Sequence, residues 1–179
     1  MLNYKNNIYL RALKTTDYKI SVKWRNDPDI WKLTLGKRYL VSEEYEKKWI
    51  ENTIFNSKDI RLAICIKSND KYIGNVYLTN IDYYNREAKE QLFIGEKSEW
   101  GKGFAFEALM QILEFGFYER NLHRIYTEIM EEHIASRKLA NKCSFREEGL
   151  LRDKIIKNGE YKNVVIFSIL RKEFENLIK

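Results

Sequence analysis

The sequence predicts a mixed α/β fold in which one sheet carries helices on both of its faces. Some short segments alternate apolar and polar residues, as half-buried strands do, and others place apolar residues three or four positions apart, as amphipathic helices do. Along the chain these segments follow the order strand, two helices, three strands, helix, strand, helix and two strands. This order differs from the regular strand–helix alternation of a doubly wound parallel sheet.

The N-terminal part begins with a short strand at 8–11, where apolar and polar residues alternate. A helix follows, because Ile20 and Trp24 lie four positions apart, and Pro28 is expected to end it. A second helix spans 42–55, where a serine N-cap precedes acidic residues in the first turn.

The remaining chain is dominated by strand patterns, and its last two strands flank Asn158-Gly159, a strong signal for a tight β-hairpin. A long helix follows the glycine-containing segment near residue 100, because its apolar residues recur at helical spacing. We expect strands at 61–67, 72–81, 89–95, 124–129, 145–156 and 161–170, and helices at 105–116 and 136–142.

Length and composition limit the class of protein. With 179 residues, 44% of them hydrophobic, we expect a single domain over 1–179 with a substantial core. No apolar segment approaches the roughly 20 residues that cross a bilayer, and the N-terminus lacks the apolar stretch of a signal peptide. Two cysteines do not make a disulfide framework. We therefore expect a cytoplasmic protein with no membrane partner.

The charge balance favours an anionic partner. The net charge is +6, from 32 Lys and Arg against 26 Asp and Glu, which is compatible with nucleic acid, an anionic membrane face or a small anionic ligand. No three basic residues are consecutive, and acidic residues are interspersed among them. A nucleic-acid-binding arm usually shows a clustered basic stripe, so nucleic acid remains only a minor alternative.

The segment Gly101-Lys102-Gly103 carries the clearest chemical signal. Glycine tolerates positive φ and lets a ligand approach the backbone, and the first amides of the following helix have no intrahelical acceptor. Such a loop binds phosphate or pyrophosphate, with Lys102 adding a charge. It lacks the Walker spacing, and Phe106 stands where a dinucleotide-binding motif has its third glycine. The alternative interpretation is a tight strand–helix connection in which glycine only relieves strain.

Motifs along nearly the whole chain resemble the GCN5-related N-acetyltransferase (GNAT) family, and more narrowly its RimJ/RimL-like branch. Residues 8–13 are similar to the opening strand of that branch, and residues 24–28 to the end of its first helix. Residues 100–108 are similar to its acetyl-CoA pyrophosphate loop, and residues 145–149 and 158–163 to its closing hairpin. The resemblance implies the GNAT fold, a mixed and mostly antiparallel central sheet of about seven strands with helices on both faces.

The resemblance also implies a reaction. Acetyl-CoA is the expected cosubstrate, and a primary amine attacks its thioester directly, without a metal or a covalent enzyme intermediate. This chemistry needs a path for the amine proton, polarisation of the carbonyl and protonation of the departing thiolate. In agreement, His123 and His133 are the only histidines, and no zinc-ligand spacing is present.

By the resemblance, the end of the strand at 89–95 pairs with the pantetheine arm and the glycine loop holds the pyrophosphate. Gly95 marks either a bulge or the end of the strand. His133 replaces an asparagine that often contacts the arm, and is alternatively an exposed helix-cap residue. The expected acetyl-CoA residues are Phe93, Ile94, Gly95, Trp100, Gly101, Lys102, Gly103, Phe104, Ala105, Phe106 and His133.

Glu90 and Ser136 are the candidate catalytic residues. Glu90 stands where many relatives carry a strand glutamate and is the expected general base, acting through a water; apolar neighbours would raise its pKa. The tyrosine that protonates the thiolate in many relatives is replaced by Ala140, whereas Ser136 stands where RimL-like members have a serine suggested for this role. The alternatives are a solvated strand glutamate and a serine N-cap. Cys143 is expected to be buried rather than nucleophilic.

The acceptor cleft is expected to be bordered by aromatic and basic residues, namely Trp24, Arg25, Tyr39, Tyr83 and Tyr84. Trp24 is alternatively a core residue, because it follows Ile20 on an apolar helix face. Acidic residues that a polyamine would need are present at Glu43, Glu44 and Glu46, but they are more simply the solvated first turn of a helix.

The leading acceptor is a protein N-terminal α-amine, by analogy with RimJ/RimL, and amino sugars and polyamines are the alternatives. An interpretation from another class is a non-catalytic acyl-CoA-binding module, which would keep the glycine loop but need neither Glu90 nor Ser136. A homodimer is a common state for small enzymes, and nothing in the sequence argues for it more strongly.

Overall fold

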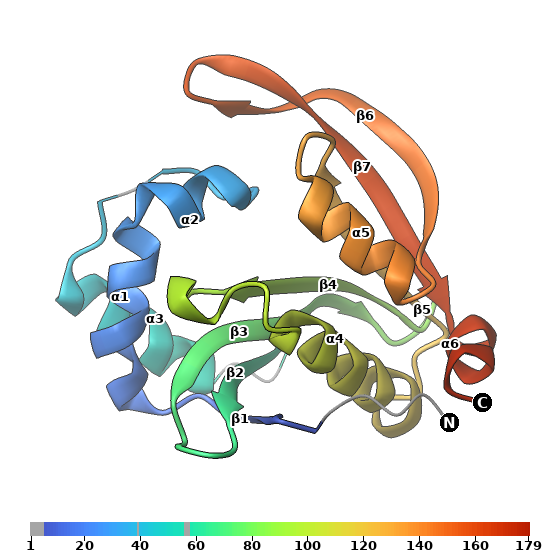
Figure 1. Cartoon of the computed structure of the whole chain (residues 1–179), viewed down its shortest axis with the longest axis horizontal. Coiled ribbons are helices and arrows are strands. Elements are labelled where there is room, and N and C mark those ends of the chain that lie inside the picture. The colour runs from blue at the N-terminus through green and yellow to red at the C-terminus, as the bar shows by residue number, and fades with distance from the viewer. Residues whose placement is uncertain (1–5, 39, 56–57) are drawn as a thin grey trace.

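The computed structural model describes residues 6–38, 40–55 and 58–179, and its centre is a seven-stranded sheet (Figure 1). Neighbouring strands are antiparallel except β4 and β5, which are parallel, and the spatial order is β1-β2-β3-β4-β5-β7-β6. This confirms the predicted mixed, mostly antiparallel sheet. The strands are β1 (Ile8–Ala12), β2 (Ile60–Ile66), β3 (Tyr72–Asp82), β4 (Glu87–Ile94), β5 (Arg124–Met130), β6 (Arg146–Lys157) and β7 (Glu160–Leu170).

Helices cover both faces of this sheet, also as predicted. Side-chain alternation along β2 sends Ile64 to one face and Ala63 and Cys65 to the other. The Ile64 face packs against α4 (Phe104–Glu114), α5 (Ile134–Lys142) and α6 (Arg171–Ile178). The opposite face packs against α1 (Tyr18–Asn26) and α2 (Pro28–Leu33), and α3 (Glu43–Ile54) packs on α1 (Figure 1).

Two helices differ from the sequence expectation. Pro28 ends α1, as expected, but it also begins α2, because proline fits the first position of a helix and Asp27 caps it by accepting from Asp29 N–H at 2.8 Å. The C-terminal helix α6 was not predicted; it buries Phe174 against Phe117. Of the described helices, none is both long and apolar enough to span a membrane.

The parallel strands β4 and β5 stay together for only three residues of β4, from Glu87 to Lys89. β4 nevertheless remains paired with β3 as far as Ile94. The Gly95 N–H donates to Ile73 O at 2.8 Å, so by the alternation of an antiparallel ladder the backbone groups of Leu92 and Ile94 face away from β3. In the described chain, one edge of β4 is therefore open beyond Lys89.

Glycines allow close approaches at this open end. Gly95 follows β4 instead of lying within it, so it marks the end of the strand and not a bulge. A Cβ at Gly95 would overlap the indole ring of Trp24, and a Cβ at Gly74 would overlap the Phe93 carbonyl. The missing side chain of Gly95 lets α1 pack directly on the end of β4, and that of Gly74 leaves room for the β4 backbone.

The β6–β7 hairpin reaches across the molecule toward α2 (Figure 1). Its turn has Asn158 and Gly159 at φ of 52° and 82°, which confirms the predicted hairpin. At the end of β6, the buried Lys157 donates to the carbonyl oxygens of Trp31 and Gly36 at 3.0 and 2.7 Å. This contact joins two chain segments that are more than a hundred residues apart.

Candidate active site

A cavity of about 890 Å³ opens where β4 and β5 diverge. Side chains from both faces of the sheet line it, including Glu90 and Leu92 on the α4 side and Gln91 and Phe93 on the α1 side. The cavity therefore passes through the plane of the sheet. One half lies against the glycine loop, α4 and α5, and the other against α1, α2 and α3.

The glycine loop leads into α4 at one mouth of this cavity. Gly101 and Gly103 have φ of 76° and 88°, and a Cβ on either would meet no atom within 4 Å. Open space next to left-handed backbone fits a ligand that approaches the main chain closely. The N–H groups of Phe106 and Glu107 already bond to Gly103 O, whereas those of Phe104 and Ala105 lie in the first turn, where no intrahelical acceptor exists.

The charges around the loop differ from the sequence expectation. Lys102 does not line the cavity; its ammonium pairs with Glu99 Oε2 at 2.8 Å on the exposed side of the loop. The cavity is instead lined by Lys138 and Lys142 from α5, with the Lys142 Nζ 4.2 Å from the Phe106 ring centroid. These two lysines were missed because the α5 face that meets the loop depends on tertiary packing.

The end of β4 and the glycine loop are tied together by Trp100, whose indole N–H donates to Ile94 O at 2.8 Å. Phe93 and Ile94 line the cavity, as expected for the strand that would hold a pantetheine arm. The Gly95 amide does not face the cavity, because it is bonded to Ile73 O. On the open edge of β4, the backbone groups of Leu92 are therefore the ones available to a pantetheine arm, in place of those expected of Gly95.

Glu90 lies at the point where β4 and β5 part. Its side chain is 4% exposed, and its Oε1 has no hydrogen-bond partner among the described residues. Burial raises the pKa of Glu90 to about 7, and the Thr127 hydroxyl opposes this shift by hydrogen bonding to the carboxylate. The position is not that of a solvated strand glutamate. A carboxyl with this pKa can accept a proton near neutral pH.

His133 and Ser136 form a hydrogen-bonded pair at the start of α5, and both line the cavity. The Nδ1 of His133 accepts from the Ser136 N–H at 3.4 Å, and its Nε2 lies 3.1 Å from the Ser136 Oγ. Burial lowers the pKa of His133, which favours the neutral ring. Because Nδ1 accepts from the N–H, we assign the proton of the neutral ring to Nε2, from which it is donated to Oγ. The hydroxyl proton of Ser136 is then free for another acceptor.

Ala140 lines the cavity one helical turn after Ser136, so a side chain at that position can supply no acid here. Cys143 is fully buried, and burial raises the pKa of its thiol to about 12. A thiol protonated to that extent is a poor nucleophile. Ser136 is therefore the hydroxyl on the cavity-facing side of α5.

In the other half of the cavity, basic and aromatic side chains from α1, α3 and β2 gather around Trp49. The guanidinium carbons of Arg25 and Arg61 lie 5.0 and 5.7 Å from the Trp49 ring centroid, and Arg61 also lies 4.9 Å from Tyr77. Glu46 is fully buried beside Arg25. The sequence interpretation of Glu46 as a solvated first-turn residue was wrong, because α3 turns this residue toward α1.

Lys89 and Glu128 face each other across the diverging strands, with Nζ and Oε2 2.7 Å apart, and both line the cavity. Trp24 is 6% exposed and packs against Tyr72 and Phe93, with ring centroids at 4.7 and 6.1 Å. Trp24 also lines the cavity, so it is at once a core residue and part of the cavity wall.

Comparisons with known proteins decide the family. A model described as an acetyltransferase (GNAT) domain matches residues 7–146. The chain belongs to the GNAT acetyltransferases. It is an acetyl-CoA-dependent N-acetyltransferase, and acetyl-CoA is its cosubstrate.

Individual GNAT relatives match the chain over nearly its whole length. The uncharacterized N-acetyltransferase p20 of Bacillus licheniformis is 31% identical over 96% of this chain and 97% of that protein. Spermidine N(1)-acetyltransferase of Vibrio cholerae is 29% identical, with coverages of 96% and 97%. A crystal structure of spermidine N-acetyltransferase from Vibrio cholerae with CoA and spermine has a TM-score of 0.89 at 28% identity, covering 96% of this chain and 100% of that one.

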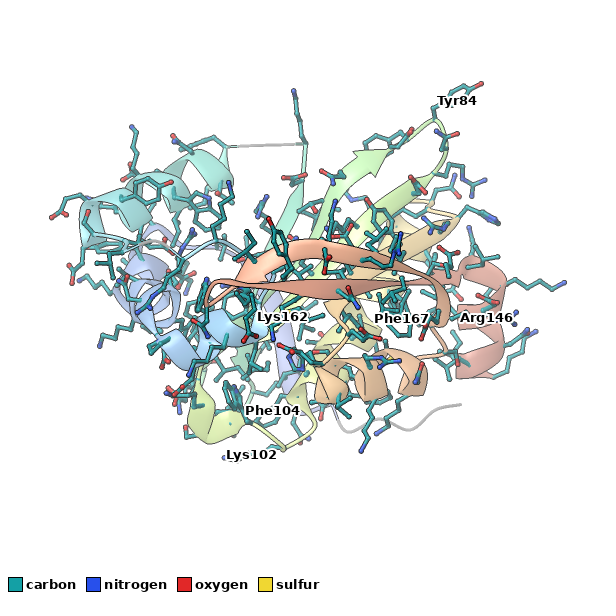
Figure 2. The ribbon with its side chains drawn as sticks, turned by 90° about the horizontal axis from the view of Figure 1, so that it is seen from above. Tyr84, Lys102, Phe104, Arg146, Lys162 and Phe167 are labelled. Atoms are coloured by element: carbon teal, nitrogen blue, oxygen red, sulfur yellow. The ribbon has the colours of Figure 1, made fainter. Side chains whose placement is uncertain are left out.

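Within this GNAT cavity, the expected acceptor residues separate into two groups. Trp24 and Arg25 line the cavity, but Tyr83 and Tyr84 do not. The two tyrosines are exposed in the β3–β4 turn, where the Asp82 carboxylate accepts from Tyr84 N–H. Figure 2 shows Tyr84 at the opposite end of the molecule from Phe104. The turn precedes the short segment over which β4 is paired with β5, whereas the cavity opens beyond the other end of that segment. Tyr39 lies outside the described residues.

Several lining residues of this GNAT cavity were missed. Trp49 was predicted only as part of an apolar helix face, and Lys89 and Glu128 were predicted only as strand residues. Charged residues such as Lys89 and Glu128 are equally compatible with a solvated strand face. No local signal distinguishes the two cases, because the cavity exists only where β4 and β5 diverge.

Proposed function

We propose that this N-acetyltransferase acetylates an α-amine at the N-terminus of a protein or peptide, with Glu90 as general base and Ser136 as general acid. The observation that carries the mechanism is the buried Glu90 carboxyl at the divergence of β4 and β5, with a pKa of about 7 and an unpartnered Oε1. An amine must lose a proton to attack a thioester, and Glu90 would accept this proton, directly or through one water.

The positioning of acetyl-CoA is supported by the backbone on either side of Trp100. The open edge of β4 near Leu92 offers main-chain groups to a pantetheine arm, as a neighbouring strand would. The amides of Phe104 and Ala105 would bind the pyrophosphate, with Lys138 and Lys142 adding positive charge. Acetyl-CoA supplies the thioester, and the protein holds it in line with the amine.

The departing thiolate needs a proton, and Ser136 is the proposed donor. His133 Nε2–H donates to its Oγ, so the Ser136 hydroxyl proton is directed elsewhere. Ala140 lies one helical turn after Ser136 and also lines the cavity, but it has no hydroxyl and cannot donate a proton to the thiolate. In this arrangement His133 positions the serine and caps the helix with the same ring.

The acceptor assignment is supported by the compensated charge of the cavity half near Trp49. Glu46 faces Arg25, and Glu128 is paired with Lys89. A polyamine carries additional ammonium groups that lose hydration on entering a cleft and need unpaired carboxylates. A peptide α-amine has no such requirement. The RimJ/RimL-like resemblance of the sequence supports the same acceptor class.

Spermidine is the second candidate acceptor, because relatives named spermidine acetyltransferases match this chain along nearly its whole length. A panel of peptides, spermidine and amino sugars, with thiol release from acetyl-CoA as the readout, tests both candidates. We expect thiol release with peptide α-amines and a kcat/KM that rises with pH through about 7, because only ionised Glu90 accepts a proton.

Two outcomes would contradict this proposal. Tight CoA binding without thiol release for any amine would indicate a non-catalytic acyl-CoA-binding module. Thiol release with spermidine but with no peptide would replace the peptide acceptor by a polyamine. Glu87→Gln is a control on the same strand, since Glu87 pairs with Arg124 and does not line the cavity.

A further inference from the structure

Glu46 is a buried carboxylate in the acceptor half of the cavity that the proposed chemistry does not use. Its side chain is fully buried and lines the cavity. Its Oε1 accepts from the Ser21 hydroxyl at 2.6 Å, whereas its Oε2 has no hydrogen-bond partner among the described residues. Burial raises the pKa of this carboxyl. An unsatisfied oxygen at such a position is costly unless a ligand or water donates to it.

Arg25 supplies the positive charge next to this oxygen. Its Nη1 lies 3.4 Å from Glu46 Oε2, which is the distance of an ion pair. This distance leaves room at the oxygen for a hydrogen-bond donor from a ligand. The guanidinium is held over the Trp49 ring at 5.0 Å, and its side chain is 32% exposed. Arg25 therefore faces the cavity and the buried carboxylate at the same time.

The remaining carboxylates around the cavity already have cationic partners. Glu128 pairs with Lys89 at 2.7 Å, and Glu99 pairs with Lys71 at 3.0 Å and with Lys102 at 2.8 Å. Glu90 is the exception, and burial raises its pKa to about 7. A second ammonium on an acceptor would thus have to displace one of the protein's own cations, or approach Arg25 and be repelled by it.

We propose that Arg25 determines the charge preference of the acceptor site by neutralising Glu46. This inference rests on the proposed amine acetylation and specifies its substrate class: amines that carry an uncharged hydrogen-bonding group, such as an amide, and no second ammonium near Arg25. An amide N–H can donate to Glu46 Oε2 while its carbonyl accepts from the guanidinium of Arg25. Specificity of this kind combines an attractive contact with a repulsive one.

The test compares two acceptors in the same thiol-release assay. The acceptors are spermidine and the dipeptide amide Ala-Ala-NH2, which has one α-amine and no other charge. For the wild type we expect a higher kcat/KM with the dipeptide amide. Arg25→Gln removes the repulsion and leaves Glu46 free, so the ratio of kcat/KM for spermidine over that for the dipeptide amide should rise about tenfold or more. Comparing ratios cancels the different nucleophilicity of the two amines.

Three further variants show whether the change comes from the Arg25–Glu46 pair. Arg25→Lys keeps the charge and should leave the ratio near that of the wild type. Arg25→Gln combined with Glu46→Gln should remove the gain, because the carboxylate is gone. Lys23→Gln removes an exposed positive charge from the same helix, outside the cavity, and should leave the ratio unchanged. Arg25→Met is a second neutral variant that should behave like Arg25→Gln.

A wild type that prefers spermidine would overturn the inference. An unchanged or lower ratio in both Arg25→Gln and Arg25→Met would also overturn it. In each of these outcomes thiol release is still observed, so the acetyltransfer itself stands. Absence of thiol release with every amine would overturn the proposed function and this inference together.

Discussion

Replacing Glu90 by glutamine separates the energetic cost of a buried carboxyl from its role in proton transfer. Burial raises the pKa of Glu90 from 4.5 to about 7, and the side chain is 4% exposed. Glutamine has the same shape but cannot ionise. Glu90→Gln should therefore lose activity and gain stability at alkaline pH.

The magnitude follows from the linkage between pKa and folding. A raised carboxyl pKa means that the folded state binds the proton more tightly than the unfolded state, so stability is greatest below the unfolded pKa and falls as pH rises. The loss extends from about pH 4.5 to about pH 7 and is complete above that. A shift from 4.5 to about 7 corresponds to about 3 to 4 kcal/mol at about 1.4 kcal/mol per pKa unit. The Glu90→Gln variant has no such loss of stability with rising pH, because glutamine does not ionise.

The assay is denaturant unfolding of the wild type, Glu90→Gln and Glu87→Gln at pH 5 and pH 9. Relative to the wild type, Glu90→Gln should gain about 2 kcal/mol or more between the two pH values, because at pH 5 part of the loss has already occurred in the wild type. Thiol release should fall by about a hundredfold or more. Glu87→Gln should show neither effect. An equal stability difference at both pH values would refute the raised pKa, and a wild-type pH–rate profile in Glu90→Gln would refute its role as base.

Other substitutions test the loop, the serine and the glycine under α1. Gly103→Ala should cost about 1 to 2 kcal/mol of stability, because alanine disfavours φ of 88°, and should raise the KM for acetyl-CoA by filling the open space beside the loop; kinetics and thermal unfolding check both. Ser136→Ala should lower kcat about tenfold or more with little change in the KM for acetyl-CoA. His133→Asn, which still caps α5, should lower kcat while leaving the melting temperature nearly unchanged. An unaltered kcat in both variants would rule out Ser136 as the general acid. Gly95→Ala should destabilise the protein by about 1 to 3 kcal/mol through overlap with Trp24, and equal unfolding midpoints would contradict this packing.

Much of the fold was predictable because its signals are local. Strand alternation, helical spacing and the Asn158-Gly159 turn act within a few neighbouring residues, and the corresponding elements are present in the structure. The short helices α2 and α6 were missed for the opposite reason. Helices of this length are marginal on their own and form because Ile30 and Phe174 are buried against other elements.

The candidate site was predictable where backbone geometry defines it. The glycine loop needs left-handed φ at Gly101 and Gly103, which only glycine adopts readily. Side chains were predicted less well, because the same residue types also suit solvated surfaces. Tyr83 and Tyr84 belong to a turn at the paired end of β4, and Lys102 pairs with its neighbour Glu99 away from the cavity.

The sequence by itself determined the order of the strands and of the helices other than α2 and α6, and the loop that begins α4, because these depend on short-range spacing. The family was indicated by the resemblance of its motifs. Only the tertiary structure decided which charged groups are buried together. Glu46 meets Ser21 and Arg25 from another helix, and Glu90 is buried because β5 diverges from β4 beside it. Burial depends on distant segments that come together in space, whereas periodicity records only neighbours along one element.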